Sequence, residues 1–219
     1  FSASGLTGVW AEENTREEIY EAFRRKETFA TSGPRIKVRF FSGYDFENAD
    51  INDLELVKKA YGGNLSMGST ISIEQAKEPK FLVWAFADPL GAPLQRIQII
   101  KGWMENGEHQ ERVYDVACSD GLIVNSSTHR CPDNGAKVNI ENCSINENSG
   151  ASELKTFWQD PDFLMEQRAF YYVRVLENPV CRWSTWDSIR EGVEPRSDIP
   201  STIQERAWTS PIWFEPTNS

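Results

Sequence analysis

Short runs with the periodicity of strands, separated by turn signals, fill most of the sequence and constrain the fold more than any other feature. The stretch "RIKVRFF" alternates Ile36, Val38 and Phe40 with charged side chains, which is the period of a strand with one buried face. Asn106 and Gly107 separate "QRIQIIKGW" from "ERVYDVAC", and this pair favours the type I′ turn of a β-hairpin. Two further strands are predicted at 170–177 and 206–214.

This strand pattern predicts a mainly β fold. The turn "DPLG" follows "FLVWAFA", so we expect strands 81–87, 95–103 and 111–118 to be three consecutive antiparallel neighbours. About seven strands of this kind favour an immunoglobulin-like or fibronectin-like β-sandwich. Weaker patterns indicate helices at 52–61 and 153–158.

The beginning of the chain does not follow the β pattern. Leu6 to Trp10 is predicted as a buried strand, and the loop "AEEN" leads to a helix from about Thr15 to Lys26. Asn14 with Glu17 and Thr15 with Glu18 both have the spacing of a capping box, so the start of the helix is indicated twice. A lone strand and helix cannot bury both faces of the strand. We therefore expect this unit either to complete a sheet of another domain or to pack across the sandwich.

A domain boundary is predicted after residue 33, because "ATSGP" ends the helical pattern. Residues 1–33 are assigned to the opening unit and residues 34–219 to the C-terminal β-sandwich domain. Within that domain, a cysteine-rich insertion at about 118–150 has few apolar residues and would gain most from covalent bracing. The chain opens without Met and in the middle of a folding pattern, so we expect it to be part of a longer polypeptide.

The chain contains four cysteines, at Cys118, Cys131, Cys143 and Cys181. None of their spacings gives the C-x-x-C knuckle of structural zinc sites, so zinc is not expected. Two disulfides are predicted, in any of three connectivities, and four free thiols are the alternative. Disulfides imply an oxidising compartment, which is the periplasm or the cell exterior.

Charge and hydropathy exclude several partners. The net charge is -10, and "RRK" at 24–26 is the main basic run, so no nucleic-acid partner is expected. Apolar runs such as 81–87 are far shorter than the roughly 18 to 20 residues of a membrane helix, so no membrane span is expected. His109 and His129 lie in neither an H-x-H nor a D-x-H arrangement, so no metal or other cofactor is expected in this chain.

Motifs of common hydrolases are also missing from the sequence. No G-x-S-x-G nucleophile elbow occurs, which argues against a serine hydrolase. Asp160 and Asp162 in "QDPDF" form a carboxylate pair, but the proline between them favours a turn over a glycosidase site.

Five motifs, in order along the chain, carry a family resemblance. They are "GLTGVWAEENTREEIYEAFRRKETFATSGPRI", "FLVWAFADPLGAPLQRIQIIKGW", "QDPDFLMEQRAFYYVRVLENP", "CRWSTWD" and "TIQERAWTSPIW". Together they resemble the C-terminal third of the bacterial family catalogued as domain of unknown function 3604, over nearly the whole chain. The resemblance implies a longer, often exported protein. Its N-terminal part is similar to the polymerase and histidinol phosphatase (PHP) superfamily of metal-dependent phosphoesterases, which have a distorted (β/α) barrel. On that basis Leu6 to about Thr31 would be the closing strand and helix of the barrel.

The resemblance also points to candidate site residues in "AEENTR". Because active sites of βα barrels lie at the C-terminal ends of the strands, Glu12, Glu13, Asn14 and Arg16 are expected to border the site. A glutamate there would orient a metal-bound water or a ligating His, and Arg16 with the helix N-terminus would attract a phosphate. The alternative is that these side chains only cap the helix and complement its dipole.

A second candidate site rests on tryptophan content, which is eight in 219 residues. "CRWSTWD" places Trp183 and Trp186 beside Arg182 and Asp187, a combination that can stack on a sugar ring and hydrogen-bond its hydroxyls. Packing of these rings in a core is the alternative.

The sequence therefore predicts an accessory, structural β domain of a metal-dependent hydrolase of the phosphoesterase type. We expect the fragment not to be catalytic by itself, its partner to be the upstream barrel domain of the same polypeptide, and any divalent metal to be bound there. The substrate is not identified. An independent carbohydrate-binding or protein-binding sandwich module is the alternative.

Overall fold

The computed structural model describes residues 5–44, 46, 49–73, 77–146 and 148–216. Within them the helices are α1 (Arg16–Arg24), α2 (Leu56–Gly63) and α3 (Trp183–Glu191). The strands are β1 (Leu6–Val9), β2 (Thr28–Thr31), β3 (Lys37–Gly43), β4 (Leu65–Ser66), β5 (Thr70–Ile73), β6 (Lys80–Phe86), β7 (Leu94–Glu105), β8 (Glu108–Cys118), β9 (Glu153–Gln159), β10 (Ala169–Glu177), β11 (Val180–Cys181), β12 (Thr202–Ile203), β13 (Arg206–Thr209) and β14 (Ile212–Pro216). The chain is mainly β, as predicted.

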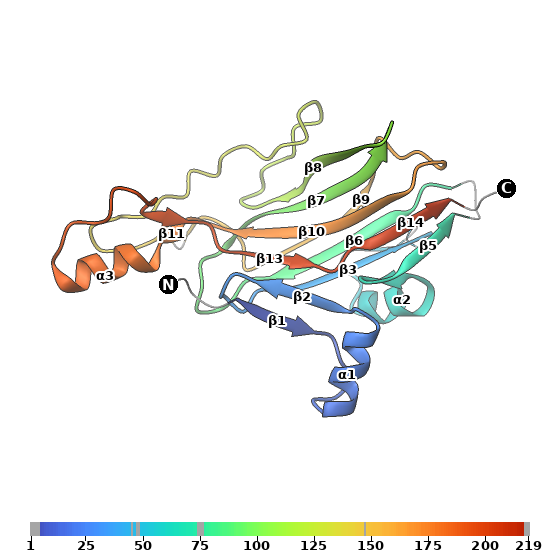
Figure 1. Ribbon diagram of the computed structural model, residues 1–219, viewed down its shortest axis with the longest axis horizontal. Helices are drawn as coiled ribbons and strands as arrows, with labels where there is room; N and C mark the ends of the chain where they lie inside the picture. The colour runs from blue at the N-terminus through green and yellow to red at the C-terminus, as the bar shows by residue number, and fades with distance from the viewer. Residues whose placement is uncertain (1–4, 45, 47–48, 74–76, 147, 217–219) are drawn as a thin grey trace.

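An eight-stranded sheet forms the larger layer of the molecule (Figure 1). Its strands follow the order β1-β2-β13-β10-β14-β5, and β7 and then β8 lie beyond the other edge of β10. β13 and β14 both pair with β10, so Ser210 and Pro211 interrupt the strand predicted at 206–214. The interruption is itself hydrogen-bonded, since Ser210 N donates to Thr28 O and Pro211 O accepts from Gly68 N. The β5–β14 pair is parallel, and the other pairs of this sheet are antiparallel.

A four-stranded antiparallel sheet, in the order β4-β3-β6-β9, packs against the larger sheet. The two sheets share one core, in which Phe40 of β3, Val83 of β6 and Val173 of β10 are fully buried. A second cluster lies on the outer face of the smaller sheet, where Leu56 and Ala60 of α2 pack against it. The alternation in "RIKVRFF" predicted the inward face of β3 correctly, since Ile36, Val38 and Phe40 all lie in this core.

The opening unit continues the larger sheet rather than standing apart from it. β1 pairs with β2, and β2 pairs with β13 through Phe29, Ala30 and Thr31. Backbone hydrogen bonds therefore cross the predicted boundary after residue 33. The four residues of β2 were not anticipated, because a strand of that length carries little periodic signal. The assignment of the unit to an upstream barrel stays a prediction.

Gly68, in the turn between β4 and β5, fixes the opening unit tightly to the rest of the chain. Its φ is +90°, and a Cβ atom at this position would lie 2.5 Å from Lys26 O and 2.7 Å from Arg25 O. Only glycine combines this backbone conformation with such a close approach. The end of α1 is thereby held against the turn.

Two predicted local structures are wrong. β6 and β7 are not neighbours, because β6 lies in the smaller sheet and β7 in the larger one. The segment between Phe86 and Leu94 therefore connects the two sheets. It is held by a backbone hydrogen bond from Ala87 N to Ser152 O. The helix predicted at 153–158 is the strand β9, which pairs along its whole length with β6. Pairing with β6 gives residues 153–159 a strand conformation, because side-chain propensity alone is a weak determinant in such a short segment.

Two disulfides brace the insertion, as predicted, and they select one of the three connectivities. Cys118 bonds Cys131, and Cys143 bonds Cys181. Between Ser119 and Ser152 the described chain has only isolated bridges in place of strands, such as Asn125 with Arg130 and Val138 with Ile145. The covalent links thus replace the sheet ladder in this region. They also indicate an oxidising environment.

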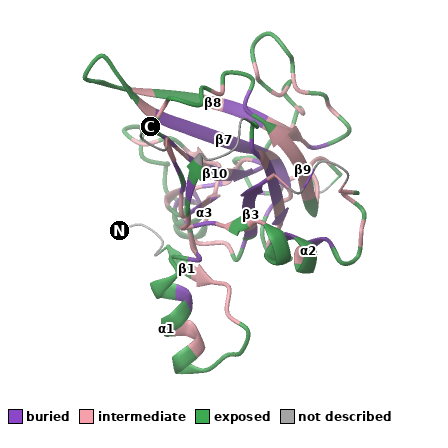
Figure 2. Ribbon diagram, turned by 90° about the vertical axis from the view of Figure 1, so that its right-hand side faces the viewer, coloured by how far each residue is buried: buried purple, intermediate pink, exposed green. Residues whose placement is uncertain are grey.

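Two helices project from the sheets. In Figure 1, α1 extends below β1 and β2, and α3 lies with β11 at the far left. Figure 2 shows most of α1 exposed, in contrast to the buried length of β7. Among the described residues, no helix has the length and apolar character needed to cross a membrane.

Candidate functional site

The four candidate residues of the opening loop lie at the start of α1. Thr15 is the N-cap, and its hydroxyl accepts a hydrogen bond of 3.3 Å from Glu18 N. Glu12, Glu13, Asn14 and Arg16 are all exposed. Of these, Glu12 lines a groove between the opening unit and the smaller sheet. The capping role falls to Thr15, and the role of the other side chains in an upstream active site stays a prediction.

The groove beside Glu12 has a volume of about 1020 Å³. The opening unit contributes Trp10–Glu12 and Arg24–Glu27, and the opposite wall comes from β3, α2 and the β4–β5 turn. Five lining side chains are cationic and two are carboxylates, although the chain as a whole has a net charge of -10: Arg24, Arg25, Lys26, Arg39, Lys58, Glu12 and Glu27. The groove is therefore a local positive region on an acidic protein.

Glu27 is the buried anchor of the groove, with 5% of its surface exposed. Its Oε1 accepts hydrogen bonds from the Tyr61 hydroxyl and from Ser66 Oγ, the latter at 2.8 Å. Arg25 lies 3.5 Å from its Oε2. Burial, and then the Glu27 carboxylate, raise the pKa of Tyr61 to about 12, so this phenol stays protonated as a donor. The Arg25–Glu27 pair combines one charge of each sign, and the other charged side chains of the lining still leave the groove with an excess of positive charge.

Trp10 and Arg39 separate this groove from a second hollow of about 820 Å³ on the outer face of the smaller sheet. The Trp10 indole N–H donates to Val38 O at 2.8 Å, which fixes the ring. The Arg39 guanidinium lies 3.5 Å above that ring and donates to the Tyr61 hydroxyl at 2.8 Å. Among the described residues Arg39 has no ion-pair partner, so its charge is available to a ligand or a partner surface.

The second candidate site, Arg182 to Asp187, begins the helix α3, which was not predicted. Trp183 and Trp186 lie one turn apart and are 42% and 40% exposed, so neither ring is a core residue. Arg182 Nε donates to Pro200 O at 3.1 Å, and Asp187 lies 3.8 Å from Arg190. The two rings are accessible, whereas the polar partners expected beside them already have protein contacts.

A buried polar cluster around Lys101 was missed by the sequence analysis. Lys101 Nζ donates to Asp160 Oδ2 at 2.6 Å and to Asp162 O at 2.7 Å, and the Tyr171 hydroxyl donates to Asp160 at 2.7 Å. Lys101 and Asp160 are each 2% exposed. Burial and the Asp160 charge raise the pKa of Tyr171, which keeps it a donor. We assign a structural role to the cluster, because its charges are paired and buried. The lone lysine in the apolar run "QIIKGW" was the available signal.

Glu177, at the end of β10, is a further buried acid that the sequence did not single out. It is 1% exposed, and its Oε1 has no hydrogen-bond partner among the described residues. Burial raises the pKa of Glu177 to about 8, against a smaller opposing effect of a backbone hydrogen bond from Ala92. The like charges of Glu205 and Asp88 raise it further. This carboxyl is therefore largely protonated near neutral pH.

Comparison with known proteins identifies a family for nearly the whole chain. The family model described as "Protein of unknown function (DUF3604)" matches residues 1–216. The chain belongs to the DUF3604 family. No curated protein and no solved structure matched the chain.

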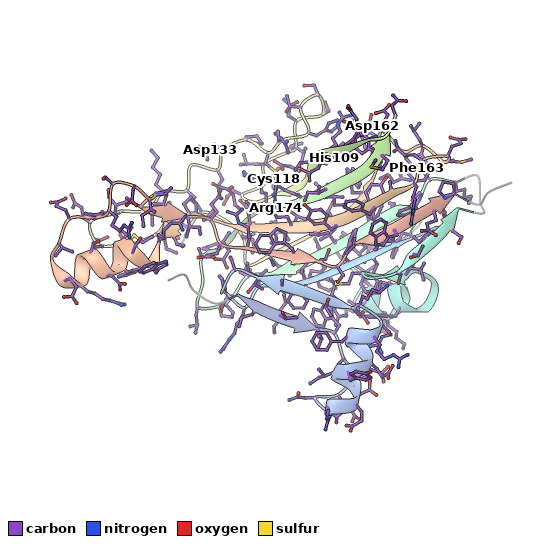
Figure 3. The ribbon with its side chains drawn as sticks, in the orientation of Figure 1. His109, Cys118, Asp133, Asp162, Phe163 and Arg174 are labelled. Carbon is purple, nitrogen blue, oxygen red and sulfur yellow. A yellow bond between two sulfur atoms is a disulfide. The ribbon has the colours of Figure 1, made fainter. Side chains whose placement is uncertain are left out.

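Within the described residues no group of three or more His, Cys, Asp or Glu side chains is placed to hold a metal ion. His109 is exposed on β8, and the half-buried His129 ring packs edge-on against Tyr114 at 5.2 Å between centroids. Figure 3 labels His109 near the end of the larger sheet.

Proposed function

We propose that this chain is an accessory β domain of a larger, exported, metal-dependent hydrolase of the phosphoesterase type, and that it is not catalytic by itself. The observation that carries the proposal is the exposed apolar surface of the opening unit. Leu6 is 42% exposed on β1, the edge strand of the larger sheet, and Tyr20 and Phe23 are 59% and 50% exposed on α1, which projects from that sheet. Fully burying an exposed apolar side chain is worth about 1.5 to 3 kcal/mol, and covering the remaining exposed half of each of these is worth about half of that, so a second domain is the natural cover.

The unit has the geometry to serve two domains. On one side β2 is paired with β13, and among the described residues β1 pairs with β2 alone, which leaves its outer edge open. An unpaired strand edge is a template for a further strand. In this proposal an upstream strand pairs with β1, and the upstream domain packs on Tyr20 and Phe23. The family resemblance supplies the identity of that domain, a PHP-like barrel that holds the metal.

The finer fold assignment and the location belong to the same proposal. Face-to-face packing of two mainly antiparallel sheets supports an immunoglobulin-like or fibronectin-like sandwich. The two disulfides support export to the periplasm or the cell exterior.

The test combines binding and activity. The upstream part of the full-length protein, produced separately, should form a one-to-one complex with this chain in analytical ultracentrifugation. Phe23→Glu should weaken the complex at least tenfold, because it places a charge in an apolar contact. Leu90→Glu is the matched control, since Leu90 is 92% exposed on the β6–β7 loop, outside the opening unit.

Activity provides the second readout. Full-length protein should hydrolyse a generic phosphoester in a chelator-sensitive reaction, and this chain alone should not. Chelator-sensitive hydrolysis by this chain alone, or equal weakening of the complex by both substitutions, would contradict the proposal.

A second candidate function is a binding module for carbohydrate or protein. The observation that favours it is the exposure of Trp183 and Trp186 on one face of α3. Rings presented in this way stack on sugars or anchor protein interfaces. Trp183→Ala should abolish binding to any oligosaccharide that the wild-type chain retains on an affinity gel. Equal retention of the variant would dismiss α3 as the site.

A further inference from the structure

Three arginines from separate parts of the chain line one small hollow on the outer face of the larger sheet. Arg96 comes from β7, Arg174 from β10 and Arg130 from the insertion, and the hollow has a volume of about 370 Å³. Asp115 is the one carboxylate among its lining residues, so the hollow carries two excess positive charges. This concentration is unusual in a chain with a net charge of -10.

A β-bulge builds the hollow. Ile97 pairs with Ala117 but Gln98 pairs with Asp115, so Val116 is an extra residue in β8. The bulge releases the Asp115 N–H from the ladder, and this group donates instead to His129 O at 2.9 Å. Bulges redirect side chains in this way and recur beside functional sites.

A second hydrogen bond and a disulfide hold the insertion at the bulge. Cys131 N donates to Asp115 Oδ2 at 2.7 Å, and Cys131 is covalently bound to Cys118 on β8. These links fix Arg130, whose guanidinium donates to Val113 O at 2.9 Å, above the sheet. Figure 3 labels Cys118 and Arg174, which mark the region of the hollow on the larger sheet.

Asp115 does not fully satisfy the charges and N–H donors of Arg96 and Arg130. Asp115 already accepts short bonds from Gln98 Nε2 at 2.6 Å and from Cys131 N. Arg96 Nε lies 4.0 Å and Arg130 NH1 3.6 Å from the Asp115 oxygens, both beyond hydrogen-bond distance. Arg96 Nε is buried and has no acceptor among the described residues.

Arg174 likewise has guanidinium N–H groups that make no hydrogen bond among the described residues. Its Nε donates to Gln98 Oε1 at 2.7 Å, which leaves the other guanidinium donors unassigned among the described residues. Each guanidinium offers five N–H donors in a planar fork. The three side chains thus present an excess of donors around one hollow with few acceptors in it.

We propose that Arg96, Arg130 and Arg174 form a binding site for a tetrahedral dianion, the sulfate or phosphate group of a small ester or of the free ion. Two excess positive charges match a dianion, and arginine forks bind such oxygens in pairs of charge-assisted hydrogen bonds. The site is independent of the proposed function, because the opening unit contributes no residue to it.

The test is calorimetric titration of the chain with sodium sulfate and with sodium phosphate, at constant ionic strength set by sodium chloride. Binding of at least one of the two dianions with one-to-one stoichiometry is expected. Arg130→Gln and Arg174→Gln should each weaken it about 10-fold to 100-fold, the equivalent of one charge-assisted hydrogen bond. Arg196→Gln is the matched control, because Arg196 is exposed and pairs with Asp198 far from the hollow.

A sugar sulfate and a sugar phosphate, titrated in parallel, distinguish a site for esters from a site for the free ion. Thermal unfolding of each variant checks that the fold is intact, and Arg130→Gln is the safest variant since Arg130 lies half-exposed on the insertion. No heat beyond that of chloride for either dianion would overturn the proposal. Equal affinity in the wild-type chain, Arg130→Gln and Arg174→Gln would also overturn it.

Discussion

The opening unit and the insertion both lie at the margins of the shared core, yet they are fixed in opposite ways. The opening unit is held by the β2–β13 ladder and by the close approach at Gly68, without a covalent link. The insertion has almost no ladder and is held by two disulfides and a web of side-chain amides. Asn134 illustrates that web, since the two N–H groups of its Nδ2 are shared among acceptors of Asn178, Asp120 and Ser119.

The two regions are held differently because they differ in composition. The insertion shows how a polar segment with few apolar side chains is kept in one conformation. The opening unit has apolar side chains to bury, such as Ala22 and Trp10, so packing and backbone pairing suffice. The insertion has too few of them, so the entropy of its unfolded state must be reduced by crosslinks. Changes to covalent links should therefore affect the insertion, and changes to packing should affect the opening unit.

The largest expected effect comes from the disulfides. Loop-closure entropy predicts a loss of about 4 kcal/mol in unfolding free energy for Cys143→Ser with Cys181→Ser, which opens a loop of 38 residues. The pair Cys118→Ser with Cys131→Ser, with a separation of 13, should lose about 3 kcal/mol. Denaturant unfolding measures both values. Hydrogen exchange should rise in the insertion and stay unchanged in β1 and β2, and a rise of equal size in both regions would break the comparison.

The titration of Glu177, at the end of β10, should have the next largest effect on the free energy of unfolding. Its pKa of about 8 in the folded chain exceeds the usual value of 4.5, so the protonated form is favoured by folding. The stabilisation is therefore complete below about pH 4.5 and is lost as pH rises through 8. The unfolding free energy should fall by on the order of 2 to 4 kcal/mol over that range.

Glu177→Gln is the variant that isolates this titration. It should flatten the dependence of unfolding free energy on pH and should be more stable than the wild-type chain at pH 8.5, because a neutral amide replaces a buried charge. Glu191→Gln is the exposed control, with no expected change in slope. An unchanged slope in Glu177→Gln would show that another group controls the titration.

Gly68→Ala tests the packing of the opening unit. The added Cβ would collide with Lys26 O and Arg25 O and would be strained at a φ of +90°. A loss of about 1 to 3 kcal/mol is expected, with faster hydrogen exchange in β1, α1 and β2. Gly62→Ala is the control, because no atom lies within 4 Å of a Cβ there and the residue is helical, so it should be neutral or slightly stabilising. Exchange that rises first in the insertion would contradict the comparison.

The smallest effect is expected from Thr15→Ala, which removes the α1 cap. Loss of the bond to Glu18 N should cost about 1 kcal/mol and fray only the first turn of α1. Asn14→Ala should change nothing, since Asn14 is not the cap. Circular dichroism and hydrogen exchange of α1 distinguish the two variants. A larger loss of helix stability in Asn14→Ala than in Thr15→Ala would show that Asn14, and not Thr15, is the N-cap.

The sequence predicted those parts of the fold that depend on local signals. The hairpin turn at Asn106 and Gly107, with φ values of 52° and 84°, and the helix at Thr15 both rest on short-range chemistry. The four cysteines indicated bracing, but their pairing depends on which segments meet in space. The partners of β6 and β2 depend on distant strands in the same way, and the two neighbours of "FLVWAFA" are β3 and β9 rather than the next strand.

The candidate sites show the same limit. Exposure of Trp183 and Trp186 depends on α3 lying off the sheets, which no feature of "CRWSTWD" reveals. Lys101 and Asp160 are 59 residues apart, so their pairing has no local signature. The three-arginine hollow requires a bulge, a disulfide and a third strand together, and no motif in the sequence announces such an arrangement.

Hydrogen exchange of the opening unit, compared between this chain and the longer protein, tests the central claim most directly. That claim is that the unit belongs to the β domain and offers its outer face to a second domain. The account predicts that β2 is as protected as β13 in both proteins, and that β1 and α1 gain protection only in the longer one. Exchange of β2 at the rate of a free peptide, or no gain in β1 and α1 in the longer protein, would contradict it.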